Sequence, residues 1–370
     1  MKNFKKTFIA LFYILVFIVP AILLLTPDKT FSNEENRLLA QRPELSLESI
    51  FSGQFMDDLE EYINDQFILR DKWVSVSTHI RRALGQSDIK NVIIQDGKLF
   101  NKRDNLSQKE QEQLDKIIQS VQKFMNNNPN CYFGLIPTAV DVYNINYPTK
   151  LNQKELIDSI YGQTNGQTVD FYGNLSNHKE EYIYYNTDHH WTTLGAYYGY
   201  EAIGNVLNFV PTDKKDFVIE NISTEFLGTT QSKINIPFDK ENIEVWVKDD
   251  GYIRIVNGVD EYDTLYDVSK LTTKEQYAVF LGGNNGNIVI KNPNATSDKK
   301  LLLVKDSYSH CLAPFLLSEY AEITLMDLRY SGVTTTQTVV DNGNFDDIII
   351  IYNIENFISD KQILFLNNFN

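Results

Sequence analysis

The chain has 370 residues, 42% of them apolar, which is enough to bury one large core or two smaller ones. Its net charge of −15 argues against a nucleic-acid-binding surface, because phosphate groups require clustered lysine and arginine. The only two cysteines, Cys131 and Cys311, exclude a disulfide-rich scaffold and a cysteine-rich metal site. Both lie in apolar contexts, so we expect two buried free thiols; a single disulfide is the alternative.

The N-terminal segment predicts a membrane anchor. Three lysines among the first six residues precede an uncharged stretch from Thr7 to Thr26, whose 20 residues match the thickness of a bilayer. The basic flank places the N-terminus inside and the rest of the chain outside the membrane. We therefore expect a single-pass anchor over residues 1–26, a polar spacer over residues 27–45 and an extracytoplasmic body. A cleaved signal peptide is the alternative, and it leads to the same compartment.

Hydrophobic periodicity predicts helices and strands in alternation along the body. Helical spacing of apolar residues predicts helices over residues 55–73 and 107–126. Val92–Ile94 followed by an Asp96-Gly97 turn predicts one edge of a hairpin. Continuous apolar runs, typical of buried strands, are Tyr132–Ile136, Leu301–Val304, Ile323–Met326 and Ile348–Tyr352. This alternation indicates an α/β fold in which helices cover both faces of a mostly parallel sheet.

The pattern changes between about residues 206 and 298. Glycine- and asparagine-rich turns separate short alternating segments there, such as Tyr252–Val256. We interpret this region as a β-rich insertion within a single α/β domain over residues 46–370.

The first segment that carries chemistry is the loop Asp188-His189-His190-Trp191. Thr192 or Thr193 is a suitable N-cap for the helix that follows, so the loop is held rigidly at a helix start. Asp188 and His190 are two residues apart and share a side if the loop is extended. A carboxylate bound to one imidazole nitrogen fixes the tautomer and leaves the other nitrogen as a base.

The second segment is Ser307, which follows directly after the apolar strand over residues 301–304. Open α/β sheets place their ligand sites at the carboxyl ends of strands. A serine in that position needs a base to become a nucleophile, and His190 oriented by Asp188 is the best candidate in the chain.

Other interpretations of the same residues remain open. Asp188, His189 and His190 are also typical ligands of a divalent metal ion, although the other histidines are scattered along the chain. Ser307 alone is equally typical of a helix N-cap. For Trp191 we expect packing in the core, with one edge of the ring lining the cleft.

The run Asp188-His189-His190-Trp191 resembles the signature of the DHHW family of envelope proteins. More widely, the chain is similar to the alginate O-acetyltransferase group of SGNH-hydrolase-like proteins, in which a serine lies far downstream of Asp-x-His-Trp. The similarity covers nearly the whole chain beyond the predicted anchor and includes Asn33–Arg37, Asp65–Phe67, Leu281–Asn284, Asp327–Tyr330 and Tyr352–Phe357. It implies an SGNH-like, flavodoxin-like fold.

The resemblance also implies roles for individual residues. Ser307 becomes the nucleophile, His190 the general base and Asp188 its orienting carboxylate, with His189 in support. Candidates for stabilising an oxyanion are Tyr308, Asn353, Gly283 and Asn284, and candidates for binding substrate are Trp191 and Arg329. No cofactor is implied.

The implied activity is transfer of an acetyl group to, or its removal from, a hydroxyl of a cell-surface polysaccharide. In related systems a multi-pass membrane O-acyltransferase delivers the acetyl group, and such a partner is expected here. A non-catalytic glycan-binding or scaffold protein is the main alternative, because tyrosines cluster around the signature and aromatic rings stack on sugars. A metal-dependent hydrolase is the third hypothesis.

Overall fold

The computed structural model describes residues 6–7, 9, 12–18, 21–22, 25–32, 37–86, 88–164, 167–248, 251–295 and 297–368. The chain forms two compact units. One consists of Met1–Lys90 with Gln231–Pro237, and the other of Asn91–Thr230 with Phe238–Asn370. The sequence predicted one α/β domain over residues 46–370, and this domain assignment stays a prediction.

The first unit is mainly helical. It contains α3 (Leu47–Phe51), α4 (Gln54–Gln66) and α5 (Arg70–Ala83), together with the short strands β1 (Phe31–Ser32), β2 (Arg37–Leu38) and β3 (Asp88–Ile89). The helix predicted over residues 55–73 is therefore interrupted. The helix α4 ends at Gln66, since Phe67 has a non-helical ψ of 140°. Leu69, with a φ of 54°, adopts the left-handed conformation directly before α5.

The predicted membrane anchor contains η1 (Ile14–Ile18). Among the residues that the structure describes, no helix combines the length and apolarity needed to cross a bilayer. Residues 1–5, 8, 10–11, 19–20 and 23–24 of the predicted anchor lie outside the described residues, as do residues 33–36 of the family-like segment Asn33–Arg37.

The second unit is built on a sheet that has eight strands within the described residues, in the order β11-β10-β12-β14-β13-β15-β6-β7. Five neighbouring strands run parallel, and the remaining three extend the sheet in antiparallel fashion from β14. The parallel strands are β14 (Glu322–Met326), β13 (Lys300–Lys305), β15 (Asp347–Asn353), β6 (Cys131–Ile136) and β7 (Gln167–Val169). The antiparallel strands are β12 (Asn287–Lys291), β10 (Ile253–Val256) and β11 (Asp260–Tyr262).

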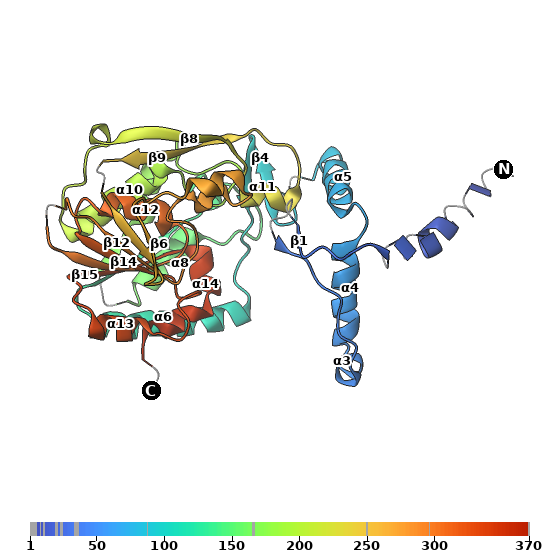
Figure 1. Cartoon of the computed structure of the whole chain (residues 1–370), viewed down its shortest axis with the longest axis horizontal. Helices are drawn as coiled ribbons and strands as arrows, with labels where there is room; N and C mark the ends of the chain where they lie inside the picture. Colours follow the sequence, from blue (N-terminus) through green and yellow to red (C-terminus); the bar gives the residue numbers. More distant parts are fainter. Residues whose placement is uncertain are drawn as a thin grey trace. The chain divides into compact units, whose positions relative to one another are not determined.

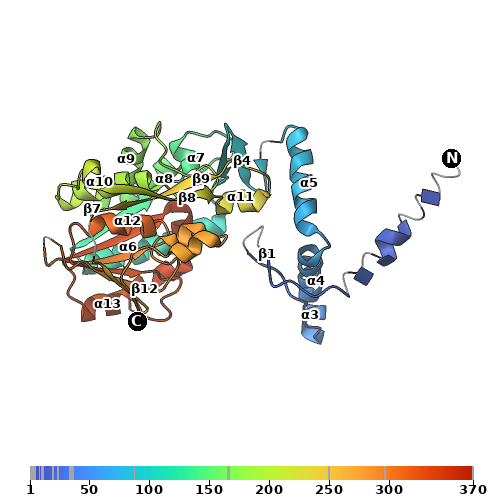
Figure 2. The ribbon, with the colours of Figure 1, turned by 45° about the horizontal axis from the view of Figure 1, so that its top comes forward.

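The expectation of a mostly parallel sheet thus needs correction, because the sheet is mixed. The region predicted as an insertion supplies β10, β11 and β12, which join the main sheet through β14. Only β8 (Val218–Phe226) and β9 (Glu241–Val247) form a separate two-stranded sheet there, seen side by side in Figure 2.

Burial on both faces explains the continuous apolar strands. Along β13, Leu301 and Leu303 belong to one apolar cluster while Leu302 and Val304 belong to the other, since successive side chains point to opposite faces. The helices α10 (Thr193–Leu207) and α12 (Ser309–Leu316) cover the first face, and α6 (Gln108–Asn127) and α14 (Ile354–Ser359) cover the second (Figure 1).

The remaining elements are β4 (Val92–Gln95), β5 (Lys98–Asn101), α7 (Ala139–Val142), α8 (Gln153–Tyr161), α9 (Phe171–Asn177), η2 (Lys214–Asp216), α11 (Thr229–Ile234), η3 (Val268–Thr272), η4 (Gln276–Val279), α13 (Thr336–Asn342) and η5 (Lys361–Leu366).

Two local predictions are confirmed. Asp96 and Gly97 form the tight turn between β4 and β5, both with positive φ. Cys131 and Cys311 are free and buried.

Candidate active site

The turn after β13 carries Ser307 and is fixed by the buried side chain of Asp306, directly before it. Asp306 accepts a hydrogen bond from the backbone N–H of Tyr308 at 3.0 Å through Oδ1. Its Oδ2 accepts from the backbone N–H of Asn353 and from the side chain of Asn356, both at 2.8 Å. The turn is thereby tied to the end of the neighbouring strand β15, and Ser307 lies at the carboxyl edge of the sheet, where the sequence predicted it.

The histidine-bearing loop runs into the start of α10. Thr192 is the N-cap, because its hydroxyl accepts from the backbone N–H of Gly195 at 3.2 Å. Trp191 is fully buried, and its indole N–H donates to the backbone oxygen of Tyr308 at 3.0 Å. This bond joins the loop directly to the turn that carries Ser307.

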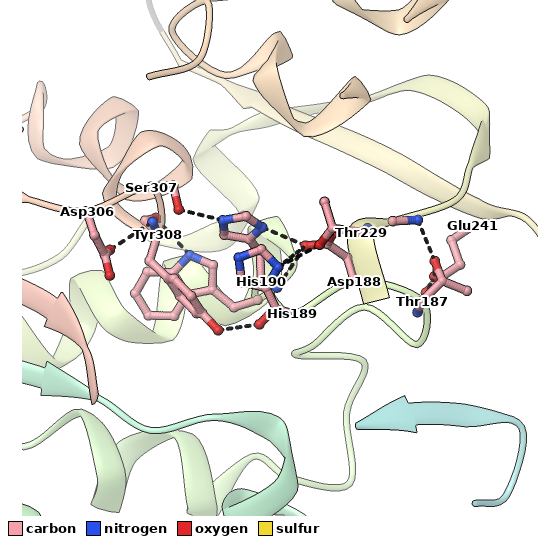
Figure 3. A network of polar contacts seen from close by, with 11 residues as sticks. Thr187, Asp188, His189, His190, Thr229, Glu241, Asp306, Ser307 and Tyr308 are labelled. Atoms are coloured by element: carbon pink, nitrogen blue, oxygen red, sulfur yellow. Dashed lines mark hydrogen bonds and ion pairs between the residues drawn. The ribbon is translucent and has the colours of Figure 1, made fainter. Parts of the chain in front are cut away.

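The two segments meet in a continuous hydrogen-bonded relay (Figure 3). The Nδ1 atom of His190 lies 2.6 Å from Oδ1 of Asp188, and its Nε2 atom lies 2.8 Å from Oγ of Ser307. The backbone N–H of His190 also donates to Asp188 at 2.9 Å. A carboxylate at Nδ1 holds the proton there, so Nε2 faces the serine hydroxyl as an acceptor.

Asp188 is held from its other side by a segment that sequence reasoning missed. Its Oδ2 accepts from the backbone N–H of Thr229 at 2.7 Å and from the Thr229 hydroxyl at 2.9 Å. Burial raises the pKa of Asp188, but the charges of His189 and His190 and these hydrogen bonds outweigh burial and hold the pKa below its ordinary value. Gly228 permits this approach, since a Cβ atom there would lie 2.2 Å from the Cβ of Asp188.

A buried glutamate on β9 fixes the start of the loop. The carboxylate of Glu241 accepts from the backbone N–H groups of Asn186 at 2.6 Å and Thr187 at 2.8 Å. It also accepts from the hydroxyls of Tyr182 and Thr187. Four donors converge on one carboxylate, so Glu241 sets the position from which Asp188 projects.

A pocket of about 230 Å³ opens over Ser307, His190 and Asp188. Tyr277, on η4, lies flat against the His190 imidazole, with ring centroids 3.8 Å apart and an interplanar angle of 8°. The other residues that line the pocket are His189, Phe226, Gly228, Thr229, Lys274, Glu275, Gln276, Ala278, Gly283, Asn284, His310, Arg329 and Asn356. The volume is sufficient for a short acyl group.

The remaining predicted candidates divide into two groups. His189, Gly283, Asn284 and Arg329 line the pocket. His189 Nδ1 contacts the Thr229 hydroxyl at 2.8 Å, and Arg329 forms a bidentate pair with Asp327.

Trp191, Tyr308 and Asn353 do not line the pocket. Each is buried and has a structural partner. The Tyr308 N–H donates to Asp306, and the Asn353 side chain donates to the Ile136 backbone oxygen at 3.2 Å while capping α14. We expected one edge of the Trp191 ring to line the cleft. The ring instead packs against Phe171 and Tyr308 and does not line the pocket.

Asp188, His189 and His190 also offer ligand atoms within 4.8 Å of one another, a spacing that could hold a metal ion. Both carboxylate oxygens of Asp188 and both ring nitrogens of His190 already take part in hydrogen bonds with protein groups. An ion would have to displace these contacts, so the donor set fits a proton relay better than a metal site.

Sequence reasoning did not find Gly228, Thr229, Glu241, Tyr277 or Asp306. All lie in turns, short helices or strand ends without a periodic signal, and four of them are distant in sequence from the residues that they support. Asp306, adjacent to Ser307, is the exception: a carboxylate directly after a buried strand was a visible signal.

Comparison with known proteins supplies further findings. The model of the DHHW protein family matches residues 104–326. A DHHW family protein from Eubacterium siraeum has a similar crystal structure, with 21% identity, a TM-score of 0.63, and coverage of 76% of this chain and 96% of that chain. Bacillus cereus PatB1 is 18% identical with a TM-score of 0.62, over 73% of this chain and 98% of that chain. The O-acetyltransferase domain of Pseudomonas putida AlgJ is 14% identical over 75% of this chain and 94% of that domain, with a TM-score of 0.45. A search of curated proteins found no match.

Proposed function

Because the chain belongs to the DHHW protein family, we propose that it is a serine-dependent O-acyltransferase or esterase. The proposed substrate is an acetyl ester of an extracytoplasmic polysaccharide. The observation that carries this proposal is the relay from Asp188 through His190 to Ser307 at the floor of a pocket. A hydroxyl, an imidazole and a carboxylate in this order are the groups that activate a serine for acyl transfer.

In the proposed first half-reaction, His190 Nε2 takes the proton of Ser307 as Oγ forms a bond to the ester carbonyl carbon. The carbonyl π electrons move to oxygen, giving a tetrahedral oxyanion. When this intermediate collapses, the bond to the leaving alcohol breaks and the proton on His190 passes to the leaving oxygen. The product is an acyl group on Ser307 and a free alcohol.

In the second half-reaction the acceptor is a sugar hydroxyl or a water molecule. His190 removes the acceptor proton as the acceptor oxygen attacks the acyl carbon, and Ser307 leaves with that proton. A sugar acceptor gives transfer and water gives hydrolysis. Gly283 and Asn284 both line the pocket beside the relay. Asn284 is proposed as an oxyanion donor through its side-chain amide, whereas the backbone N–H of Gly283 already donates to the Phe280 backbone oxygen at 3.2 Å.

The proposed location is outside the cytoplasmic membrane. Its support is the basic N-terminal flank followed by an apolar stretch of anchor length. A multi-pass membrane O-acyltransferase is the proposed acyl donor, since a tethered enzyme would receive the acetyl group at the membrane surface.

The test is hydrolysis of a chromogenic acetyl ester by the full chain, followed by mass spectrometry. A solved structure of Bacillus cereus PatB1 carries a sulfonyl adduct, which suggests an aryl sulfonyl fluoride as a second probe. We expect turnover, and an adduct on Ser307, in the wild type. Ser307→Ala should lose both, and His190→Ala should slow both by several orders of magnitude.

Absence of turnover and of any adduct in a folded chain would reject the proposal. It would favour a non-catalytic glycan-binding protein, and binding to immobilised polysaccharide that survives in Ser307→Ala would then be the next measurement.

A further inference from the structure

A second network of buried polar side chains ends beside Ser307 and is not part of the relay from Asp188 through His190 to Ser307. The Nζ atom of Lys305 lies 2.7 Å from Nε2 of His310 and 3.1 Å from Oδ2 of Asp327. Asp327 in turn accepts two hydrogen bonds from Arg329, at 2.9 and 2.7 Å. The Lys305 and Asp327 side chains are completely buried, and His310 and Arg329 at the two ends both line the pocket.

The chemistry of lysine determines where the protons lie in this network of side chains. Burial lowers the pKa of Lys305, and the Asp327 carboxylate beside it opposes that shift. As an ammonium group, Lys305 has only protons to donate, so Nε2 of His310 accepts from it. The imidazole is then neutral with its proton on Nδ1. Burial and the charge of Lys305 also lower the pKa of His310 well below its ordinary value, which agrees with a neutral ring.

The position of His310 brings this proton close to the reacting atoms. His310 follows Ser307 by three residues, and its backbone N–H donates to the Ser307 backbone oxygen at 3.2 Å. No residue in the described part of the chain accepts a hydrogen bond from His310 Nδ1. The ring therefore has one unused donor, in a residue that lines the same pocket as the nucleophile.

We propose that His310 donates a hydrogen bond from Nδ1 to the carbonyl oxygen of the ester bound over Ser307. Lys305 acts as a positioning residue, which holds the His310 tautomer with the support of Asp327 and Arg329. This inference rests on the proposed acyl chemistry and adds a donor that the relay alone does not contain. A neutral donor suits an oxyanion because its proton is held in place before charge develops.

Two substitutions separate this role from a structural one. Asn places an amide close to the position of Nδ1, so His310→Asn keeps a donor toward the pocket and loses the acceptor for Lys305. Gln places its amide close to the position of Nε2, so His310→Gln keeps the acceptor for Lys305 and loses the Nδ1 donor. We expect His310→Gln to lower kcat for the chromogenic ester by roughly 10²-fold and His310→Asn by less than about 10-fold.

A structural role of His310 gives the reverse order, because His310→Asn leaves the buried Lys305 without its imidazole partner. Thermal unfolding of both variants identifies any loss of fold. If His310→Asn is the slower variant, or if both variants keep wild-type kcat, the proposal is wrong.

Nitrogen-15 NMR of His310 in the wild type tests the proposal without turnover. We expect a protonated Nδ1 and an unprotonated Nε2 throughout the range from about pH 6 to 8. A ring protonated on Nε2, or a cationic ring, would overturn the assignment even in a chain that hydrolyses its ester. A wild-type chain with the expected tautomer but without ester turnover would reject the proposed function and, with it, the role of His310 as a donor to the ester.

Discussion

Tyr277 covers one face of the His190 imidazole in a parallel stack with a centroid distance of 3.8 Å. The Asp188 carboxylate is hydrogen-bonded to Nδ1 at the edge of the same ring. The hydrogen bond fixes the direction in which the ring points, and the stack on Tyr277 fixes the tilt of its plane. The electron-rich tyrosine face would also favour the imidazolium that the proposed mechanism requires.

Replacing Tyr277 with Leu should lower kcat for ester hydrolysis by about 2- to 10-fold, which corresponds to about 0.5–1.5 kcal/mol for an aromatic contact. Tyr277→Phe keeps the ring and should retain most of the activity. Equal losses in the two variants would show that the hydroxyl, rather than the stack, is what matters.

Asp188 should link stability to pH. Its pKa in the folded state lies below the ordinary value of 3.8, so the folded chain binds fewer protons there than the unfolded chain. The stability that this carboxylate contributes is fully present above about pH 5 and is lost as the pH falls through about 4 and below.

The measurement is urea unfolding of the wild type and of Asp188→Asn at several pH values. The difference in the free energy of unfolding should be constant near neutral pH and shrink below about pH 4. Asp188→Asn should also lower kcat by about 10³- to 10⁴-fold, as in other serine triads. A difference that widens toward acid would contradict the pKa direction.

Gly228→Ala should damage both fold and activity. The added Cβ would lie 2.2 Å from the Cβ and 2.5 Å from Oδ2 of Asp188, so the carboxylate must move. We expect a loss of about 1–3 kcal/mol in the free energy of unfolding, together with a fall in kcat. Gly162→Ala serves as the control, because its Cβ would make only an ordinary contact, 3.4 Å from the Asp158 backbone oxygen. Wild-type activity in Gly228→Ala would show that Asp188 can shift without consequence.

Glu241→Ala should slow the proposed ester hydrolysis although it replaces none of Asp188, His190 and Ser307. The substitution leaves the backbone N–H groups of Asn186 and Thr187 without their acceptor, at a cost of about 1–3 kcal/mol for each buried donor. We expect a lower melting temperature and a fall in kcat of about 10-fold or more. Glu244→Ala on the same strand is the matched control, and similar effects in both variants would refute the special role of Glu241.

Treatment with EDTA should leave ester hydrolysis unchanged. The ligand atoms of Asp188 and His190 are engaged in hydrogen bonds, and the proposed mechanism takes no step on a metal ion. Loss of turnover on chelation, followed by recovery with a divalent ion, would instead support the metal hypothesis for Asp188, His189 and His190.

The elements with a strong periodic signal could be predicted from sequence. The strands around Leu303, Leu325 and Ile350 and the helix over residues 107–126 all carry uninterrupted apolar patterns. The attachment of β12 to β14 could not be predicted, because an alternating strand pairs equally well in a hairpin or at the edge of a larger sheet.

The site could be predicted only where chemistry marks the residue. Asp188, His190 and Ser307 combine residue type with a position at a helix start or a strand end. Tyr277 and Gly228 carry no such mark, because an aromatic residue in a turn usually packs in the core and a glycine usually serves a turn. Their roles depend on tertiary contacts with residues far away in the sequence.

The turn of Asp306 makes the surroundings of Ser307 depend on a later part of the chain. Asp306 is anchored by Asn353 and Asn356, and the base His190 reaches the serine across 117 residues of chain. These contacts can form only when β15 and α14 have docked beside β13. The proposed reactivity of Ser307 would therefore depend on a folding step that needs residues far downstream of the serine.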